Sequence, residues 1–384
     1  MYGNYELEIY LAGLRGVLPK LPIDIRAIEK KAVEAWPETI ASYVQGGCGD
    51  EGTQDLNVSA FSRWGLVPRM MVDCAKRDLS IDLFGMKLPT PIFMAPIGVI
   101  GICSQDGHGD LATARAAAKT GVPMMASTLT VDPMEAVAAE FGDVPGFFQL
   151  YTPNDRGVAE SFVRRAEAAG FKALVVTLDT WIAGWRPRDL TRSSFPQLRG
   201  HCLTNYFTDP VFRSRLSKPP EEDPVTAVHL WASVFGEALT WNDLPWLRSL
   251  TKLPLLLKGI CHPDDVRRAI DGGVDGIYCS NHGGRQANGG LSCLEMLPAV
   301  VEAAGNVPVL FDSGVRTGTD VVKAIALGAT AVGIGRPYAW GLALDGVDGI
   351  VHVLRCILAE ADLLMAIDGF PTLADVKAAT KIKI

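Results

Sequence analysis

Residues 164–179, RRAEAAGFKALVVTLD, contain the pattern that decides the fold: an Ala-rich amphipathic stretch, a glycine, and a short apolar run rich in β-branched residues. A glycine just past a helix supplies its left-handed cap, and an uninterrupted apolar run is typical of a parallel strand covered on both faces. The segment therefore predicts a helix followed by a buried strand. The same pattern recurs in ARAAAKTG-VPMMAS (cap Gly121), RRAIDGG-VDGIYCS (Gly273), VEAAG-NVPVLFD (Gly305) and KAIALG-ATAVGIG (Gly328), with Gly170 as the cap of the segment quoted first.

Eight such apolar runs follow one another from about residue 90, and a helical stretch follows each of them, the last near residues 349–366. Eight near-equal strand–helix units predict a closed (β/α)8 barrel, the TIM barrel of the α/β class. A doubly wound open sheet is the alternative, but no G-x-G-x-x-G follows the first strand. The predicted strands are residues 91–98, 122–128, 146–151, 173–179, 253–259, 276–282, 307–314 and 331–337.

Two additions to the barrel complete the predicted organisation. Residues 1–90 form an N-terminal extension with a helix over 25–44, and residues 181–250 form an insertion between strands four and five. A loop of that length in a compact domain is typical of a lid or a mobile segment. We therefore expect one domain over residues 1–384, with the barrel built from 91–180 and 251–370.

Composition excludes several classes of protein. Of 384 residues, 48% are hydrophobic and the formal net charge is −7. With no Lys/Arg run, this argues against a nucleic-acid binder. No stretch approaches the ~20 apolar residues that cross a bilayer, and the N-terminus lacks the features of a secretory signal, so we expect a cytoplasmic protein without membrane contact. The eight cysteines form no C-x-x-C, which favours reduced core thiols over disulfides or a zinc site; no metal is expected.

Polar side chains gather where the predicted strands end. Because barrel enzymes place their sites at the carboxyl ends of the strands, these residues are candidates for function. Gly314 and Gly335 lie after strands seven and eight, and each is followed by an arginine, Arg316 and Arg336. The loops after these two strands are the usual phosphate site of such barrels. The alternative is a pair of turn glycines with solvated arginines.

The sixth strand ends in SNHGGR, which brings His282 and Arg285 to the same rim. Arg285 can bind a carboxylate through two hydrogen bonds, and Asp179 of strand four can reach His282 and stabilise its protonated form. This combination indicates a general base that acts on an anionic substrate. Lys258, at the end of strand five, is compatible with a Schiff base or with stabilising negative charge on a cofactor ring.

Six motifs stand out along the chain. They are FFQLY (147–151), LDT…GWRPRD (178–189), LLLKG (255–259), SNHGGRQ (280–286), FDSGVRTGTDV (311–321) and GIGRPY (333–338). Together they resemble one family, the FMN-dependent 2-hydroxy-acid oxidases and dehydrogenases, and the resemblance runs in order from about residue 25 to residue 375. Within the family, the segments 95–110, 177–190, 202–206 and 280–290 are most similar to the lactate 2-monooxygenase branch.

The resemblance implies a role for each site residue. His282 would be the base, with Asp179 to orient it and Tyr151 near the substrate oxygen. Tyr43, Arg186 and Arg285 would hold the substrate carboxylate, with Tyr151 and Gly98 beside the substrate. The FMN would lie against Ala95, Pro96, Ile97, Ser127, Gln149, Thr177 and Lys258 at its ring and against Ser280, Asp312, Ser313, Gly314, Arg316, Gly335 and Arg336 towards its phosphate.

The implied reaction is the oxidation of an L-2-hydroxy acid by dioxygen, with L-lactate as the first candidate substrate. Decarboxylation would then give acetate, CO2 and water. The alternative is an oxidase that releases keto acid and H2O2, and a different class is a phosphate-binding lyase or isomerase that uses Lys258. Gly98, where many oxidases carry Ala, favours retention of the keto acid, whereas Ala183, where the branch implies Phe, widens the entrance. The family also implies a homotetramer or homo-octamer.

Overall fold

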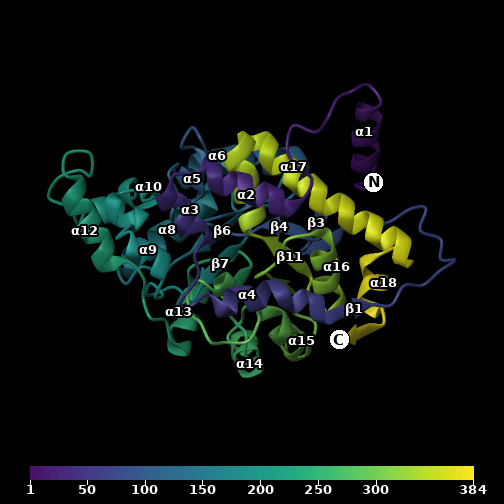
Figure 1. Ribbon diagram of the computed structural model, residues 1–384. Coiled ribbons are helices and arrows are strands. Elements are labelled where there is room, and N and C mark those ends of the chain that lie inside the picture. The colour runs from purple at the N-terminus through teal and green to yellow at the C-terminus, as the bar shows by residue number, and fades with distance from the viewer.

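The computed structural model describes all 384 residues and contains one parallel eight-stranded barrel. Its strand order is β4-β11-β10-β9-β8-β7-β6-β5, and a parallel bridge between Met94 and Met124 joins β4 to the segment entering β5, which closes the cylinder. In Figure 1 the labelled strands β4, β6, β7 and β11 lie in the middle of the molecule, with helices around them. The predicted barrel is confirmed. Its strands are β4 (Ile92–Met94), β5 (Met125–Ala126), β6 (Phe147–Leu150), β7 (Leu174–Thr177), β8 (Leu255–Lys258), β9 (Gly276–Cys279), β10 (Val309–Phe311) and β11 (Ala331–Ile334).

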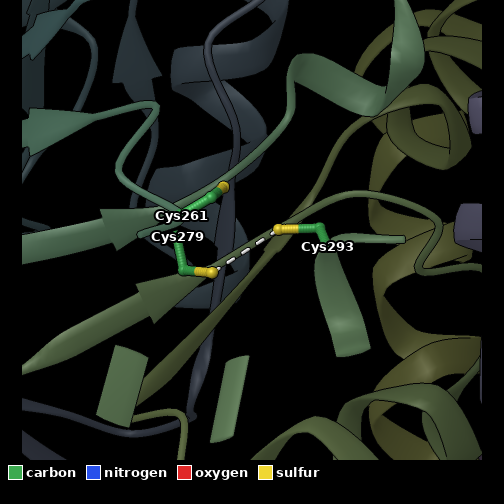
Figure 2. A group of neighbouring side chains, drawn as sticks. All are labelled: Cys261, Cys279 and Cys293. Atoms are coloured by element: carbon green, nitrogen blue, oxygen red, sulfur yellow. Dashed lines mark hydrogen bonds between the residues drawn. The ribbon is translucent and has the colours of Figure 1, made fainter. Parts of the chain in front are cut away.

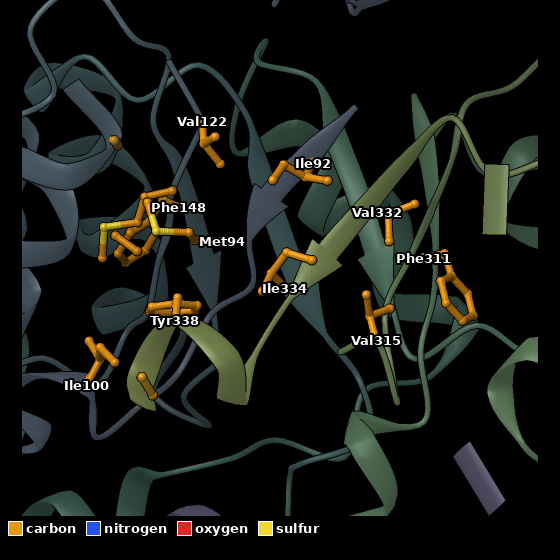
Figure 3. Packing of buried hydrophobic residues seen from close by; sticks show 14 of the residues in the cluster. Ile92, Met94, Ile100, Val122, Phe148, Phe311, Val315, Val332, Ile334 and Tyr338 are labelled. Atoms are coloured by element: carbon orange, nitrogen blue, oxygen red, sulfur yellow. The ribbon is translucent and has the colours of Figure 1, made fainter. Parts of the chain in front are cut away.

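Both faces of the barrel wall are buried, as the uninterrupted apolar runs predicted. Leu174 and Val176 of β7 face the outer core beneath the helices, whereas Val175 between them belongs to a separate interior cluster. Figure 3 shows side chains of the outer core, among them Ile92, Phe311 and Val332. The hairpin of β2 (Ile81–Leu83) and β3 (Met86–Leu88) packs against the interior cluster, at the end where the strands begin.

Helices surround the barrel, and their caps agree with the sequence. All five predicted cap glycines have positive φ angles, and Asp155 caps its helix by accepting from the backbone N–H groups of Gly157 and Val158. The helices after the strands are α5 (Ile100–Cys103), α6 (Gly109–Thr120), α7 (Met134–Ala139), α8 (Arg156–Ala169), α14 (Pro263–Asp271), η4 (His282–Gly284), α15 (Cys293–Ala304), α16 (Gly318–Ala326) and α17 (Arg336–Asp368).

Two helix predictions need correction. The single helix expected over 25–44 is two helices, because Pro37 cannot continue the first one and instead starts the second. The last helix begins at Arg336 rather than near residue 349, and it bends at Asp345 and Gly346. The elements outside the barrel at the two ends of the chain are α1 (Asn4–Gly13), α2 (Ile25–Ala35), α3 (Glu38–Gln45), α4 (Gly52–Ser59), η1 (Ala60–Arg63), β1 (Trp64–Leu66), α18 (Leu373–Ala378) and β12 (Lys381–Lys383).

The insertion between β7 and β8 is a chain of short helices rather than a structureless loop. Its longest element spans 11 residues, and buried side chains such as Tyr206 and Trp231 join it to the outer core. None of the helices combines the length and the hydropathy that a membrane span requires. The insertion contains α9 (Pro187–Thr191), η2 (Pro196–Arg199), α10 (Thr204–Phe207), α11 (Pro210–Arg213), α12 (Pro224–Val234), η3 (Trp241–Asp243) and α13 (Leu244–Ser249).

Candidate active site

A cavity of about 1100 Å³ opens at the carboxyl ends of the barrel strands. It is lined by residues from the loops after seven strands, by the last residue of β8, by α3 of the N-terminal extension and by the insertion. Most of the predicted site residues therefore converge on one space. Those that line it are Tyr43, Ala95, Pro96, Ile97, Gly98, Tyr151, Arg186, Lys258, His282, Arg285, Asp312, Ser313, Gly314, Arg316, Gly335 and Arg336.

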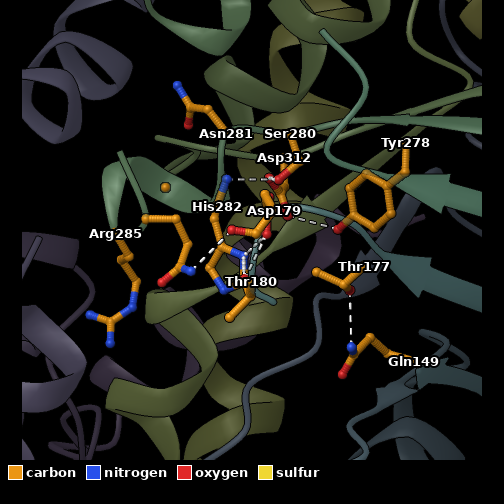
Figure 4. A network of polar contacts seen from close by, with 12 residues as sticks. Gln149, Thr177, Asp179, Thr180, Tyr278, Ser280, Asn281, His282, Arg285 and Asp312 are labelled. Carbon is orange, nitrogen blue, oxygen red and sulfur yellow. Dashed lines mark hydrogen bonds and ion pairs between the residues drawn. The ribbon is translucent and has the colours of Figure 1, made fainter. Parts of the chain in front are cut away.

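His282 and Asp179 form the central pair of the site (Figure 4). The distance from Nδ1 of His282 to Oδ1 of Asp179 is 2.7 Å. Thr180 donates its hydroxyl to the same carboxylate oxygen at 2.7 Å and lies 3.2 Å from Nδ1 of His282. His282 has a φ of 56°, a backbone conformation that non-glycine residues rarely adopt. The fold thus accepts local strain to aim this imidazole at the cavity.

The electrostatics around the pair favour the neutral form of the imidazole. Burial and the Lys258 ammonium lower the pKa of His282, and the opposite effect of Asp179 does not offset them. The prediction that Asp179 stabilises protonated His282 is therefore right in sign but outweighed. Burial opposes ionisation of Asp179, yet His282 and Lys258 hold the pKa of that carboxyl well below its usual range. An anionic Asp179 beside a neutral His282 fixes Nδ1 as the protonated nitrogen and leaves Nε2 free to accept a proton.

Tyr43, Arg186 and Arg285 form a cationic wall on one side of the cavity. The guanidinium carbons of Arg285 and Arg186 lie 4.9 Å and 5.6 Å from the centre of the Tyr43 ring. Arg186 donates from Nε to the backbone carbonyl of Arg285 at 3.1 Å, which fixes the two side chains relative to each other. Burial and the charge of Arg186 lower the pKa of Arg285 to about 10. Two guanidiniums held this close are stabilised by an anion between them.

Five predicted residues lie behind the cavity rather than on its lining. Ser127 donates to Oε1 of Gln149 at 3.0 Å, and Nε2 of Gln149 donates to the Thr177 hydroxyl at 2.9 Å, so the three form a row at the ends of β5, β6 and β7. Asp179 stands behind His282. Ser280 donates to Oδ1 of Asp312 at 2.5 Å, and that aspartate also accepts from Tyr278 at 2.8 Å.

The two arginines after β10 and β11 lie at the far end of the cavity. Arg316 lies over the ring of Trp340 at 5.3 Å, and Arg336 donates to the carbonyl of Val44 at 2.8 Å. Burial and the neighbouring arginines lower the pKa of Arg336. Gly314 has a φ of 90°, and a Cβ there would lie 2.1 Å from the Asn57 carbonyl oxygen, so its glycine is required by close backbone packing as well.

These residues fit a bound flavin mononucleotide. Five cations line the cavity, while Asp312 is the one acidic side chain among the lining residues. Lys258 is 2% exposed, has no hydrogen bond or ion pair with the protein, and lies 5.4 Å above the Tyr278 ring. A buried ammonium without a partner is costly unless an anionic group approaches it. The cation excess suits two anions, a phosphate at Arg316 and Arg336 and a carboxylate at Arg186 and Arg285.

Ten of the 26 lining residues are not among the predicted site residues, and four of them have side chains that shape the site. Thr180 lies next to Asp179, and its role is visible only once the His282 geometry is known. Phe195 and Phe235 come from the insertion, where they pack against Tyr43 and Tyr151 with ring centres 6.1 Å and 5.5 Å apart. Leu129 follows β5 and faces the cavity. Apolar residues in irregular segments carry no signal in the sequence that separates them from core residues.

Comparison with known proteins gives consistent results. The family model described as FMN-dependent dehydrogenase matches residues 32–382. The L-lactate oxidase of Lysinibacillus sphaericus is 40% identical over 100% of this chain and 98% of its own, and human 2-hydroxyacid oxidase 1 is 41% identical over 92% and 94%. The solved structure of a soluble mutant of (S)-mandelate dehydrogenase from Pseudomonas putida covers 94% of this chain and 99% of its own, with 33% identity and a TM-score of 0.84.

Proposed function

This chain belongs to the FMN-dependent dehydrogenase family, and we propose that it oxidises an L-2-hydroxy acid, with L-lactate as the first candidate, and uses dioxygen as the acceptor. The sequence motifs predicted this family. Its cofactor is FMN, and its chemistry is the flavin-dependent oxidation of 2-hydroxy acids. Family membership sets aside the lyase or isomerase that Lys258 had left open. The observation that carries the proposal is His282, held by Asp179 at 2.7 Å, on the same cavity as the Arg186–Arg285 wall.

The substrate carboxylate binds at the cationic wall. Arg186 and Arg285 donate to its two oxygens, and the Tyr43 hydroxyl completes the contact. Charge-assisted hydrogen bonds of this kind contribute roughly 1.5–3 kcal/mol each. A carboxylate held at three points leaves the carbon bearing the hydroxyl with one orientation, which selects one hand of the substrate.

His282 takes the proton of the substrate hydroxyl at Nε2. Asp179, bound to Nδ1, then stabilises the imidazolium that forms, and Thr180 holds that carboxylate in place. Tyr151 lies near the same hydroxyl, and burial raises the pKa of its phenol, so that it acts as a hydrogen-bond donor. A flavin held beside the substrate carbon would supply hydride-accepting chemistry.

The flavin-holding residues divide into two groups. Ala95, Pro96, Ile97 and Gly98 would face the ring from β4, and Lys258 would stabilise negative charge on it, with Ser127, Gln149 and Thr177 as polar partners. At the other end, Arg316 and Arg336 would hold the phosphate. Ser280, Asp312, Ser313, Gly314 and Gly335 shape that end of the cavity.

The fate of the keto acid depends on how firmly the residues after β7 close the cavity. Gln286 donates from Nε2 to the carbonyls of Asp179 and Ile182, at 3.0 Å and 2.9 Å. A Cβ at Gly184 would lie 2.5 Å from the Gln286 carbonyl oxygen. This tie favours retention of pyruvate beside H2O2, and peroxide converts retained pyruvate to acetate, CO2 and water. We therefore propose the monooxygenase outcome first.

The oxidase outcome is the second candidate. It is favoured by the relatives, because the proteins named L-lactate oxidase or 2-hydroxyacid oxidase are about 40% identical to this chain. Ala183 on the cavity lining also leaves the entrance wider than a bulkier residue would.

One experiment tests the reaction and its outcome. The purified yellow protein is mixed with L- and D-2-hydroxy acids under nitrogen, and flavin bleaching is followed by absorbance. Air is then admitted and the products are quantified. L-lactate should bleach the flavin, and acetate and CO2 should equal the O2 consumed. Stoichiometric pyruvate and H2O2 select the oxidase, and absence of bleaching by every L-acid contradicts the proposal.

The proposal includes the assembly and location implied by the family. Apolar side chains of the N-terminal segment, such as Tyr10, Leu14 and Leu18, are exposed in the single chain and favour contact with further copies. Four or eight copies of a cytoplasmic protein are expected. Light scattering of the pure protein and cell fractionation check these two statements.

A further inference from the structure

Three cysteines that are far apart in sequence meet on the outer side of the barrel wall (Figure 2). Cys261 lies in the segment after β8, Cys279 is the last residue of β9, and Cys293 is the first residue of α15. Their sulfur atoms all lie within 4.8 Å of one another, and the Sγ atoms of Cys279 and Cys293 are 3.6 Å apart. Cys279 and Cys293 are fully buried, whereas Cys261 is partly exposed. None of the three lines the active-site cavity.

These separations match those between sulfur ligands of one metal ion. Zn–S bonds of about 2.3 Å place two thiolates roughly 3.8 Å apart in a tetrahedral site and about 4.0 Å apart in a trigonal one. The observed separations therefore need to change by less than about 1 Å, which side-chain rotation supplies. A disulfide is a different arrangement, since its sulfur atoms are about 2.05 Å apart.

The chemistry of the cluster selects a soft divalent ion. Its three ligand atoms are all sulfur, with no carboxylate or imidazole in the group, which disfavours Mg²⁺ and Ca²⁺ and favours Zn²⁺ or Cd²⁺. Three thiolates with a divalent cation have a net charge of minus one, whereas with a monovalent cation they have minus two. The smaller net charge is less costly to bury. Cys293 starts a 12-residue helix, whose N-terminus stabilises that charge.

Cys261 is the member of the cluster that solvent reaches. It is partly exposed, and its thiol donates to the Ser280 carbonyl oxygen at 3.2 Å. An ion would therefore enter at the Cys261 side.

We propose that Cys261, Cys279 and Cys293 form a three-thiolate site for a soft divalent cation, Zn²⁺ in the cell, with an exogenous fourth ligand at the Cys261 side. Binding forms three metal–sulfur bonds and releases the remaining thiol protons to solvent. Because the ion would join β8, β9 and α15, it would also stiffen the strands that carry Lys258 and lead to His282. Cysteine spacing does not indicate this site, because the three cysteines are 18 and 14 residues apart along the chain.

The test titrates the reduced holoenzyme with Cd²⁺ alone under nitrogen, with thiolate-to-metal absorption as the readout. One Cd²⁺ per chain should bind. Cys261→Ser should weaken binding by about 10²-fold or more, because one of three ligands is lost. Cys356→Ser, which changes another partly exposed cysteine outside the cluster, should bind as the parent does. Unchanged affinity in Cys261→Ser, or no absorption band in the parent, overturns the proposal.

A second measurement does not depend on any variant. The parent holoenzyme is treated with an alkylating reagent with and without equimolar Zn²⁺, and each modified cysteine is identified by mass spectrometry. Zn²⁺ should protect Cys261 and leave Cys356 as reactive as before. Equal modification of Cys261 in both samples would contradict the site.

Discussion

The two ends of the barrel interior differ in what they bury. At the end where the strands begin, the interior is apolar: Phe93, Phe147 and Leu256 pack together, and Leu83 and Leu88 of the β2–β3 hairpin cover them. At the end where the strands finish, the cavity is lined by five cations and contains two non-glycine residues with positive φ, His282 and Ser313. The first end maximises packing, whereas the second leaves charges unpaired.

This difference shows how one cylinder separates stability from function. Burial of apolar surface at the closed end stabilises the folded chain, and nothing there is left for a ligand to satisfy. Burying cations without anionic partners at the open end costs free energy. Bound anions remove that cost, so the unpaired cations favour anion binding. Tyr278 connects the two ends, since its ring packs against Phe93 and its hydroxyl donates to Asp312.

The largest expected effect is at the open end. His282→Ala should lower kcat/KM for the hydroxy acid by ~10²–10⁴-fold, the usual contribution of a general base. The flavin should remain bound, and the melting temperature should change little because the side chain packs against the cavity rather than the core. Anaerobic stopped-flow absorbance gives the rate of flavin reduction. A variant that reduces flavin at the parental rate would contradict the assignment of the base.

A change at the closed end should lower the stability of the protein and leave its activity nearly unchanged, the reverse of His282→Ala. Phe147→Ala removes a buried ring from the interior cluster, and we expect a loss of about 3–5 kcal/mol in the free energy of unfolding. Activity per folded molecule should stay within about twofold, because Phe147 does not line the cavity. Urea unfolding and steady-state kinetics on the same samples measure both quantities. A large fall in activity at constant stability would remove the contrast between the two ends.

Lys258→Met tests whether the open end stores unfavourable charge. Without added FMN, loss of the unpartnered ammonium should raise the stability by about 1 kcal/mol. With FMN, the affinity for the flavin and the reduction rate should both fall. Urea midpoints with and without FMN separate the two effects. Lower stability of the flavin-free variant would mean that the parent already compensates this charge.

The closed end was also the more predictable end from sequence. All eight strands were predicted, but each prediction ran past the observed carboxyl end or began before the observed start, as in 307–314 against Val309–Phe311. Residues such as Asp312 and Ser313 leave the ladder because they turn into the cavity, and apolar periodicity does not register that turn. The helix predicted over 25–44 was wrong because Pro37, which cannot continue a helix, lies within that range.

The open end could be predicted only in part. His282, Arg285 and Lys258 were found because polar residues at the ends of apolar runs stand out, whereas Tyr43 was found through the family resemblance alone. Phe195 and Phe235 were missed, since short helices without periodicity give no indication of which face they present. The net lowering of the His282 pKa depends on burial and on Lys258 from another strand, and neither can be read from local sequence.

The pH dependence of the reaction is a smaller effect. It separates the effects of Lys258 and Asp179 on the pKa of His282. Neutral His282 is required, so kcat/KM should be full above its pKa and fall as the pH drops through it, at a value below the ordinary 6.5. Lys258→Met removes a charge that lowers this pKa, so the acid limb should move to higher pH. Asp179→Asn removes the charge that raises it, so the limb should move to lower pH. Initial rates at low substrate between pH 4 and 8 would show this (the usual working range around a histidine pKa). Shifts in the same direction for both variants would contradict the assignment.

The smallest expected effect concerns Gly98, which is part of the cavity lining. A Cβ there would lie 3.3 Å from the Leu129 Cβ, 3.4 Å from its Cδ1 and 3.6 Å from the Ser127 hydroxyl, so the methyl fits only if Leu129 shifts by a few tenths of an ångström. Gly98→Ala should therefore raise KM for L-lactate by only about tenfold or less, the lower end of what one methyl contributes.

The products should respond more clearly than KM. A methyl at position 98 removes room beside the retained keto acid, so a larger share of turnovers should end in free pyruvate and H2O2, measured against total O2 consumed. Shortening the neighbour in Gly98→Ala/Leu129→Ala removes the Leu129 Cδ1, which would lie 3.4 Å from the new methyl, and should move the ratio back towards the parental one. If the ratio is the same in all three proteins, the space at Gly98 does not control retention, and the tie between Gln286 and the residues after β7 must carry it alone.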